Sequence, residues 1–181
     1  MFKQIATMSV LTLSITGCVS PVKDTAFAAE AAITITKESY TPDLMDTVKL
    51  SSNSMKINKM VSKLKKHVGK TWYVFSGSSP SGWDCSGMTL WAYKQIGIPL
   101  EHRASKQQHS GVKVSSPKYG DIVVFKYKGS KSAYHVGIYI DENTMIHAGG
   151  GKGDRTSIES ISNFAGKHSK VSYVRMIETS S

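Results

Sequence analysis

The feature that most constrains this chain is a cysteine, Cys85, whose neighbours suit a reactive thiol better than a packed core. It stands in the run Gly-Trp-Asp-Cys-Ser-Gly-Met over residues 82–88, directly before an apolar stretch that predicts a helix as far as about Ile96. A thiol at the start of a helix faces the positive end of the helix dipole, which favours the thiolate over the thiol. We therefore expect Cys85 to be a nucleophile at the N-terminus of a helix.

Two histidines follow on segments with the alternating pattern of β-strands. His135 lies within residues 134–140 and His147 within residues 144–148, and residues 141–143 read as the hairpin loop between them. A single histidine on a strand is usually structural. Two of them on one hairpin, after a cysteine at a helix start, are candidates for a shared catalytic task.

The length of this hairpin predicts how its residues pair. Suppose that Ile140 pairs with Thr144 across the loop. His147 then lies opposite Gly137, on the same face as His135 and diagonal to it, within reach of a long side chain. A slip of one residue would send one histidine to the other face. The spacing is therefore compatible with a contact between the two rings.

These residues fit the relay of a cysteine nucleophile. His135 would accept the thiol proton of Cys85 as general base, and His147 would hold the ring of His135 in one tautomer and orientation. Zinc binding is the other chemistry open to a cysteine and two histidines, but the chain has no Cys-x-x-Cys or His-Glu-x-x-His pattern. We therefore expect no metal and no other cofactor.

The N-terminus has the pattern of an export signal. Lys3 supplies a positive charge before the apolar residues 5–16, which are too few and too rich in threonine for a membrane span. Two processing sites compete. The run Ile-Thr-Gly-Cys ending at Cys18 resembles a lipobox, and Ala-Phe-Ala ending at Ala28 suits ordinary signal peptidase. Either site places the mature protein outside the cytoplasm, secreted or anchored to the cell surface, and a lipid on Cys18 is the only membrane attachment that we expect.

Composition divides the rest of the chain into a linker and one domain. Residues 29–53 are rich in Thr, Ser and Asp and predict a linker after an export signal over residues 1–28. Ser54 can cap a helix over residues 55–68, which would open a domain over residues 54–181. The apolar face of this helix, at helical spacing, comprises Ile57, Met60, Val61, Leu64 and Val68.

Strand patterns dominate the second half of the chain. Period-two patterns predict strands over residues 121–127, 134–140, 144–148 and 171–177. Helices first and consecutive strands later indicate an α+β fold with a central antiparallel sheet. The helix that begins at Cys85 would pack on that sheet and bring the thiol to the histidine strands.

The chain is strongly basic, with 23 Lys and Arg against 13 Asp and Glu and a net charge of +10 at pH 7. Such a field attracts polyanions. For an exported bacterial protein, anionic wall polymers or lipid headgroups are more plausible partners than nucleic acid. The lysines are scattered, without the arginine-rich arm or stacking motif of a nucleic-acid reader. A charged surface that only keeps the protein soluble is the alternative.

Four segments together resemble the NlpC-type cell-wall peptidases. Residues 73–88, which end in Gly-Trp-Asp-Cys-Ser-Gly-Met, are similar to the nucleophile motif of that family, and residues 119–125 are similar to its central strand. The runs His-Val-Gly-Ile-Tyr at residues 135–139 and Met-Ile-His-Ala at residues 145–148 are similar to its two histidine strands. The resemblance covers about residues 55–176. The four segments together are specific to this family, although no single one of them is.

The resemblance implies a papain-like α+β fold and a peptidase that hydrolyses the stem peptides of peptidoglycan, typically after D-glutamate. Its implied catalytic residues are Cys85 as nucleophile, His135 as base and His147 as the third polar residue. Its implied substrate-binding residues are Tyr73 beside the nucleophile, Asp84 and Ser86 for the free amine of a stem peptide, and Arg103. The pair Glu101-His102 departs from the family, which carries a proline before the arginine.

Two other functions stay open. An amidase or acyltransferase could use the same fold, because attack by a thiolate serves both hydrolysis and transfer. A catalytically silent wall-binding module is the other possibility, although the intact Cys85, His135 and His147 argue against it. We expect the protein to act on bacterial peptidoglycan as a monomer.

Overall fold

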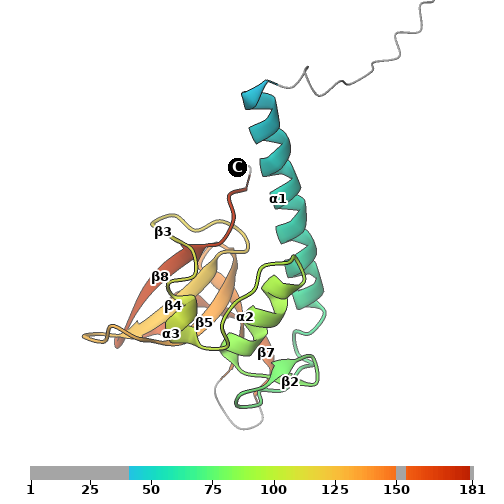
Figure 1. Cartoon of the computed structure of the whole chain (residues 1–181). Helices are drawn as coiled ribbons and strands as arrows, with labels where there is room; N and C mark the ends of the chain where they lie inside the picture. The colour runs from blue at the N-terminus through green and yellow to red at the C-terminus, as the bar shows by residue number, and fades with distance from the viewer. Residues whose placement is uncertain (1–40, 150–153, 180–181) are drawn as a thin grey trace, which may run out of the picture. The chain divides into compact units, whose positions relative to one another are not determined.

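The computed structural model describes residues 41–149 and 154–179 (Figure 1). The expected export signal and the first part of the expected linker lie outside these residues. The described residues combine helices with an antiparallel sheet, which confirms the predicted α+β class. Within them, no helix is long and apolar enough to cross a membrane.

The first helix is longer than the sequence pattern predicts. α1 (Pro42–Lys65) begins after Thr41, whose Oγ1 accepts from the Leu44 N–H. A proline occupies the first turn, where its missing N–H would have no partner in the helix in any case. Residues 42–53, which composition assigns to a linker, are therefore helical, and the predicted start near Met55 is wrong.

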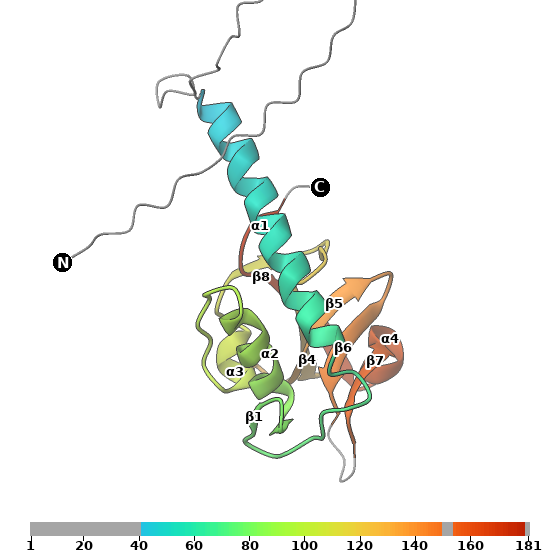
Figure 2. The same cartoon turned by 90° about the vertical axis from the view of Figure 1, so that its right-hand side faces the viewer.

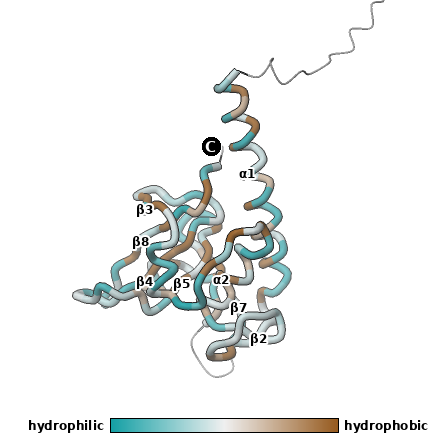
Figure 3. Tube along the Cα trace, in the orientation of Figure 1, coloured by the Kyte–Doolittle hydropathy of each residue, from teal (hydrophilic) through white to brown (hydrophobic). Residues whose placement is uncertain are grey.

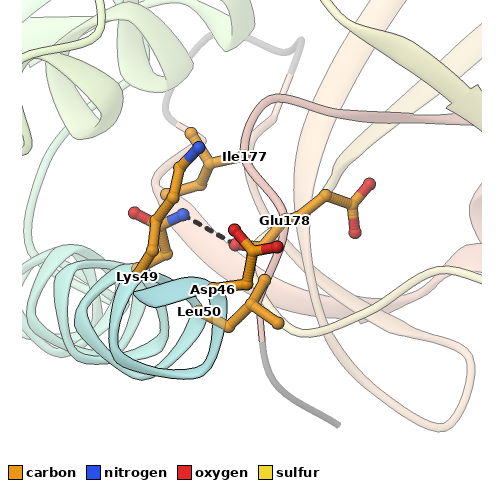
Figure 4. A pocket seen from close by; sticks show the side chains of 6 residues that line it. Asp46, Lys49, Leu50, Ile177 and Glu178 are labelled. Carbon is orange, nitrogen blue, oxygen red and sulfur yellow. Dashed lines mark hydrogen bonds between the residues drawn. The ribbon is translucent and has the colours of Figure 1, made fainter. Parts of the chain in front are cut away.

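The two halves of α1 have different surroundings. The C-terminal half packs as its spacing predicts, and its buried residues are Ile57, Met60, Val61 and Leu64. The N-terminal half faces the C-terminal segment across a cavity of about 430 Å³ (Figure 4). There Asn53 Nδ2 donates to the Glu178 carbonyl oxygen at 2.8 Å. Leu44, Met45 and Val48, in the first turns of the helix, are exposed. Figure 3 colours apolar positions brown along the chain, the start of α1 included.

A six-stranded antiparallel sheet forms the centre of the domain (Figure 1, Figure 2). Its order is β3-β8-β4-β5-β6-β7, so β5 and β6, which carry the two histidines, are neighbours. The strands are β3 (Val112–Val114), β4 (Ile122–Tyr127), β5 (Ala133–Asp141), β6 (Thr144–Ala148), β7 (Thr156–Ser160) and β8 (Ser169–Arg175). The sequence pattern predicts β4, β5, β6 and β8, and it misses β3 and β7.

The cysteine segment forms a helix that is entered through a short hairpin. Its parts are β1 (Ser78–Ser79), β2 (Gly82–Trp83) and α2 (Cys85–Lys94), followed by the short α3 (Ala104–Gln107). Tyr93 Oη donates to the Gly120 carbonyl oxygen at 2.6 Å, which ties the end of α2 to the segment that leads into β4. The helix therefore has a fixed position on the sheet.

Both faces of the sheet are covered. Along β4, Ile122 and Val124 belong to the core that includes α1 and α2. Val123 and Phe125 point the other way and belong to a second cluster with α4 (Ile161–Ala165). Because both of its faces are buried, β4 is a continuous apolar run at its start.

The β5–β6 hairpin has the predicted register, with a change at its tip. Ile138 pairs with Ile146, as the prediction requires. At the tip, Thr144 pairs with Asp141 and not with Ile140, because an irregularity in β5 takes up one residue. The predicted tip pairing is therefore wrong, but the register next to the histidines is unchanged.

Candidate active site

Asp84 caps the N-terminus of α2, the helix that begins at Cys85. Its Oδ1 accepts from the Gly87 N–H at 2.7 Å and from the Ser86 hydroxyl at 2.9 Å, and its Oδ2 accepts from the Ser76 N–H at 3.1 Å. An aspartate that accepts from the first-turn N–H groups is a favourable helix cap. Cys85 is the first residue of α2, which confirms its predicted position.

Gly87 allows the loop before α2 to lie against the first turn of the helix. A Cβ at this position would collide with the Gly77 carbonyl oxygen, which itself accepts from the Asp84 N–H at 3.1 Å. A larger residue would therefore displace the loop over residues 73–77. Close packing of the loop against the helix thus explains why the Asp-Cys-Ser-Gly run has a glycine at position 87.

A pocket of about 390 Å³ opens beside the cysteine. Its walls come from the loop before α2, from the segment that leads into α3 and from the start of β5. Five of the predicted site residues line it, namely Tyr73, Asp84, Cys85, Ser86 and Arg103. The fold therefore brings together side chains from three separate segments.

The two histidines are buried and contact each other. His135 Nε2 and His147 Nδ1 are 3.0 Å apart, with the ring planes inclined at 77°. This confirms the contact that the hairpin register predicts. The other ring nitrogen of His147, Nε2, lies 3.0 Å from Glu159 Oε2 and 3.1 Å from Ser157 Oγ.

Gly137 and Phe164 determine the space around the two rings. A Cβ at Gly137 would lie 2.8 Å from Met145 Sδ, 3.0 Å from the Ile146 carbonyl oxygen and 3.3 Å from His147 Cβ, so a side chain at this point of β5 would crowd β6. The Phe164 ring packs against both imidazoles, with centroids 4.5 Å from His135 and 4.9 Å from His147. Packing therefore holds the pair in place.

The cysteine helix meets the strand that carries His135. α2 packs against β5, and the Val136 N–H lies beside the Cys85 thiol. No hydrogen bond joins that thiol to the His135 ring within residues 41–149 and 154–179. The proton transfer between them therefore stays a prediction, and such contacts often tighten only when substrate binds.

Burial determines the protonation of Cys85 and His135. It raises the pKa of Cys85 to about 11; the Val136 N–H opposes this rise and the Asp84 carboxylate adds to it. It lowers the pKa of His135 to about 3, with His147 acting in the same direction and Asp84 against it. Both groups are therefore neutral at pH 7. The N–H groups of Cys85 and Ser86 at the helix start do lower the pKa of the thiol, as expected, but desolvation outweighs them.

Tyr73 and Arg103 present polar groups to the pocket. Burial raises the pKa of Tyr73, and Cys85 and Asp84 add to the rise, so the hydroxyl keeps its proton at pH 7. Arg103 is exposed and precedes α3. The described part of the chain holds no ion pair to its guanidinium, which is therefore accessible to a ligand.

Three residues of the site were not predicted from the sequence. His102 Nε2 lies 2.9 Å from Asp84 Oδ1, in the wall of the pocket. Gln107 is fully buried and donates through Nε2 to the Ser86 carbonyl oxygen at 2.8 Å. The third is Glu159. Only His102 is marked in the sequence, as a histidine where the family carries a proline. The contacts of all three join residues that are distant in sequence.

Comparison with known proteins identifies the family. The model of the NlpC/P60 family matches residues 69–176, a range that contains the cysteine, both histidines and the pocket residues. The chain belongs to the NlpC/P60 family. The resemblance that the sequence motifs indicate is thereby confirmed.

Curated relatives in this family are named probable endopeptidases. The chain is 38% identical over 99 residues to the probable endopeptidase p60 of Listeria grayi, a match that covers 54% of this chain and 19% of the relative. It is 45% identical over 78 residues to a probable endopeptidase of Corynebacterium glutamicum, covering 42% of this chain and 35% of the relative. The matched part thus spans about a third or less of these relatives.

Solved structures of the family share the fold. The NlpC/p60 domain of the peptidoglycan hydrolase SagA is 32% identical, with a TM-score of 0.57 over 66% of this chain and 98% of that domain. RipD from Mycobacterium tuberculosis, described as a non-catalytic NlpC/p60 domain protein adapted to peptidoglycan binding, is 16% identical, with a TM-score of 0.57. That match covers 67% of this chain and 98% of RipD, and it shows the fold alone.

Proposed function

We propose that this protein is a cysteine-type peptidoglycan endopeptidase, cutting the stem peptide between D-glutamate and the diamino acid. The observation that carries the proposal is the site itself. Cys85 stands at a helix start on a pocket of about 390 Å³, and the adjacent strands β5 and β6 bring the paired His135 and His147. The names of the relatives, probable endopeptidases and the peptidoglycan hydrolase SagA, agree with this chemistry.

Acylation would begin with both reacting groups neutral, so proton transfer accompanies the attack. As the sulfur of Cys85 bonds to the scissile carbonyl carbon, the thiol proton passes to His135. The C=O π electrons move to the oxygen, which the Tyr73 hydroxyl can stabilise by donating a hydrogen bond. His147 holds the ring of His135 during the transfer.

The intermediate then breaks down in two steps. His135 gives its proton to the nitrogen of the diamino acid, the C–N bond breaks, and the D-glutamyl group remains as a thioester on Cys85. His135 next takes a proton from water, which attacks the thioester carbonyl. The sulfur leaves with its bonding electrons and regains the proton from His135, so the resting state is restored.

The carboxylate of Asp84 offers a place for the free amine of a stem peptide. Among the described residues, its Oδ1 already accepts from Gly87, Ser86 and His102, whereas its Oδ2 accepts from the Ser76 N–H alone. A carboxylate oxygen can accept more than one hydrogen bond, so Oδ2 has capacity for an ammonium group. The exposed guanidinium of Arg103 suits a carboxylate of the same substrate.

Two other functions use the same residues differently. RipD shows that this fold can serve peptidoglycan binding without catalysis, but the His135–His147 contact beside an intact Cys85 favours an enzyme here. An amidase or acyltransferase would form the same thioester and differ in the bond cut or in the acceptor. The chemistry of the released fragments separates these functions.

Digestion of purified peptidoglycan, followed by mass analysis of the fragments, tests the proposal. An endopeptidase releases one fragment ending in D-glutamate and another beginning with the diamino acid. Cys85→Ala should release neither, with an unchanged circular dichroism spectrum. Binding of the wild type without release would favour a wall-binding module, and release of whole stem peptides would favour an amidase. Full activity in a folded Cys85→Ala variant would exclude the thiol mechanism.

We also propose that the protein works outside the cytoplasm and that its basic surface meets anionic wall polymers. On neighbouring strands, Lys126 of β4 lies opposite Lys170 of β8, and Lys128 and Lys131 follow in the exposed turn after β4. Like charges that face each other across strands destabilise a sheet. A polyanion bound at this end would relieve that repulsion, and export through the N-terminal signal would bring the protein to such polymers.

A further inference from the structure

Strand β7 brings a carboxylate to the histidine pair. β7 pairs with β6, where Ser157 is opposite His147 and Glu159 is diagonal to it. Ser157 Oγ and Glu159 Oε2 both lie within hydrogen-bond distance of His147 Nε2, at 3.1 Å and 3.0 Å. The outer nitrogen of His147 therefore has two oxygen partners of different chemistry.

These two partners place different demands on the His147 ring. A carboxylate only accepts hydrogen bonds, so Glu159 requires a proton on His147 Nε2, whereas the Ser157 hydroxyl can donate or accept and fits either tautomer. Burial lowers the pKa of His147, against the opposing effects of Glu159 and Asp154, so the neutral ring carries one proton. With that proton on Nε2, the Nδ1 of His147 is an acceptor.

The His135 ring is constrained in turn. Because His147 Nδ1 can only accept, His135 Nε2 must donate across their 3.0 Å contact. The neutral His135 ring then keeps its lone pair on Nδ1. In the opposite arrangement, His147 Nδ1 would donate to His135 Nε2, and His135 Nδ1 would carry the hydrogen. No free lone pair would then remain on His135 to accept a proton.

We propose that Glu159 is a positioning residue that sets the tautomers of both His147 and His135, and so keeps a lone pair of His135 free. Ser157 cannot do this alone, because a hydroxyl is compatible with both arrangements. The use of that lone pair in catalysis rests on the proposed function. The tautomers themselves follow from the chain of hydrogen bonds between the two neutral rings and Glu159.

Nitrogen NMR of histidine-labelled protein at pH 7 tests the tautomers directly. In the wild type, His135 and His147 should both carry hydrogen on Nε2. Glu159→Gln places an amide that can donate to His147 Nε2, so forms with hydrogen on Nδ1 should appear in both rings. Ser157→Ala, which keeps the carboxylate, should retain the wild-type pattern, as should Glu142→Gln in the exposed β5–β6 turn.

Hydrolysis of a stem peptide supplies the second readout. In Glu159→Gln, kcat should fall on the order of 10- to 100-fold with little change in KM, as when a group that orients a histidine is lost. Unchanged tautomers in Glu159→Gln would overturn the inference, and so would an equal change in Ser157→Ala. If the tautomers shift as expected while the wild type cuts no peptidoglycan, the role of Glu159 stands and the proposed function fails.

Discussion

His102 Nε2 lies 2.9 Å from Asp84 Oδ1, so the aspartate that caps α2 is also held from the wall of the pocket. The Gly87 N–H and the Ser86 hydroxyl donate to the same oxygen. Asp84 is thereby held in one orientation, in which Oδ2 keeps most of its capacity to accept. A residue that the family pattern does not include thus supports the proposed amine site.

Removal of this contact should weaken the binding of substrates with a free amine. His102→Ala should raise KM about tenfold for a stem peptide with a free N-terminus and leave kcat nearly unchanged, since a hydrogen bond to a charged group contributes about 1.5 kcal/mol. The same peptide with an acetylated N-terminus is the control, and its KM should not change. Equal KM values for wild type and His102→Ala on the free peptide would contradict the role.

The buried His135 predicts sensitivity to acid. Its pKa is about 3 in the folded protein, against about 6.5 in the unfolded chain, so between these values the unfolded chain binds the extra proton. The free energy of unfolding should therefore fall as pH drops from about 6.5 towards 3. Urea titrations across this range measure it. His135→Gln should make this decline less steep. The control His168→Gln, at an exposed site, should leave it unchanged. If the free energy of unfolding falls equally steeply with pH in wild type and His135→Gln, His135 is not the cause.

Gly137→Ala should force β5 and β6 apart. The new Cβ would lie 2.8 Å from Met145 Sδ and 3.0 Å from the Ile146 carbonyl oxygen, and the second neighbour is backbone that can move only with its strand. We expect a loss of about 1–3 kcal/mol in the free energy of unfolding, the range typical of overpacking. Activity per folded molecule should also fall, because the histidine pair spans these strands. A variant as stable and as active as the wild type would show that the hairpin tolerates the extra carbon.

The facing lysines predict salt-dependent action on intact walls. Turnover on walls should fall as salt rises, while turnover on a small stem peptide should not, because screening weakens only the attraction to the polymer. Lys126→Gln combined with Lys170→Gln should lower wall turnover at low salt and flatten its salt dependence. Lys56→Gln combined with Lys59→Gln on exposed positions of α1 is the matched control. If turnover on walls and on the peptide responds identically to salt, the lysines contribute only to solubility.

The two processing sites predict two mature forms that differ in mass. Use of the first gives a protein that begins at an acylated Cys18, and use of the second gives one that begins at Ala29 without lipid. Intact-mass analysis of protein from the producing cell distinguishes them. A start at Ala29 rules out the anchor, and a mature form that keeps residues 1–17 would contradict export.

Local features of the site could be predicted from the sequence because their causes lie within a few residues. Asp84 caps the helix that begins at Cys85 through N–H groups of the adjoining turn. His135 and His147 meet because a short hairpin fixes the register of its strands, and the irregularity at the tip did not alter it. The predicted start of the first helix at Ser54 failed, because the helix begins after Thr41, whose side chain caps it.

Only the tertiary structure decided the charge state of the site and the outer partners of its histidines. The dipole of one helix favours a thiolate at Cys85, but the pKa responds to everything packed around the thiol, and desolvation is the larger effect. Glu159 reaches His147 because β7 pairs with β6, and His102 reaches Asp84 from the segment before α3. Such contacts join residues whose local patterns carry no information about one another, so they exist only once the sheet and the helix have assembled.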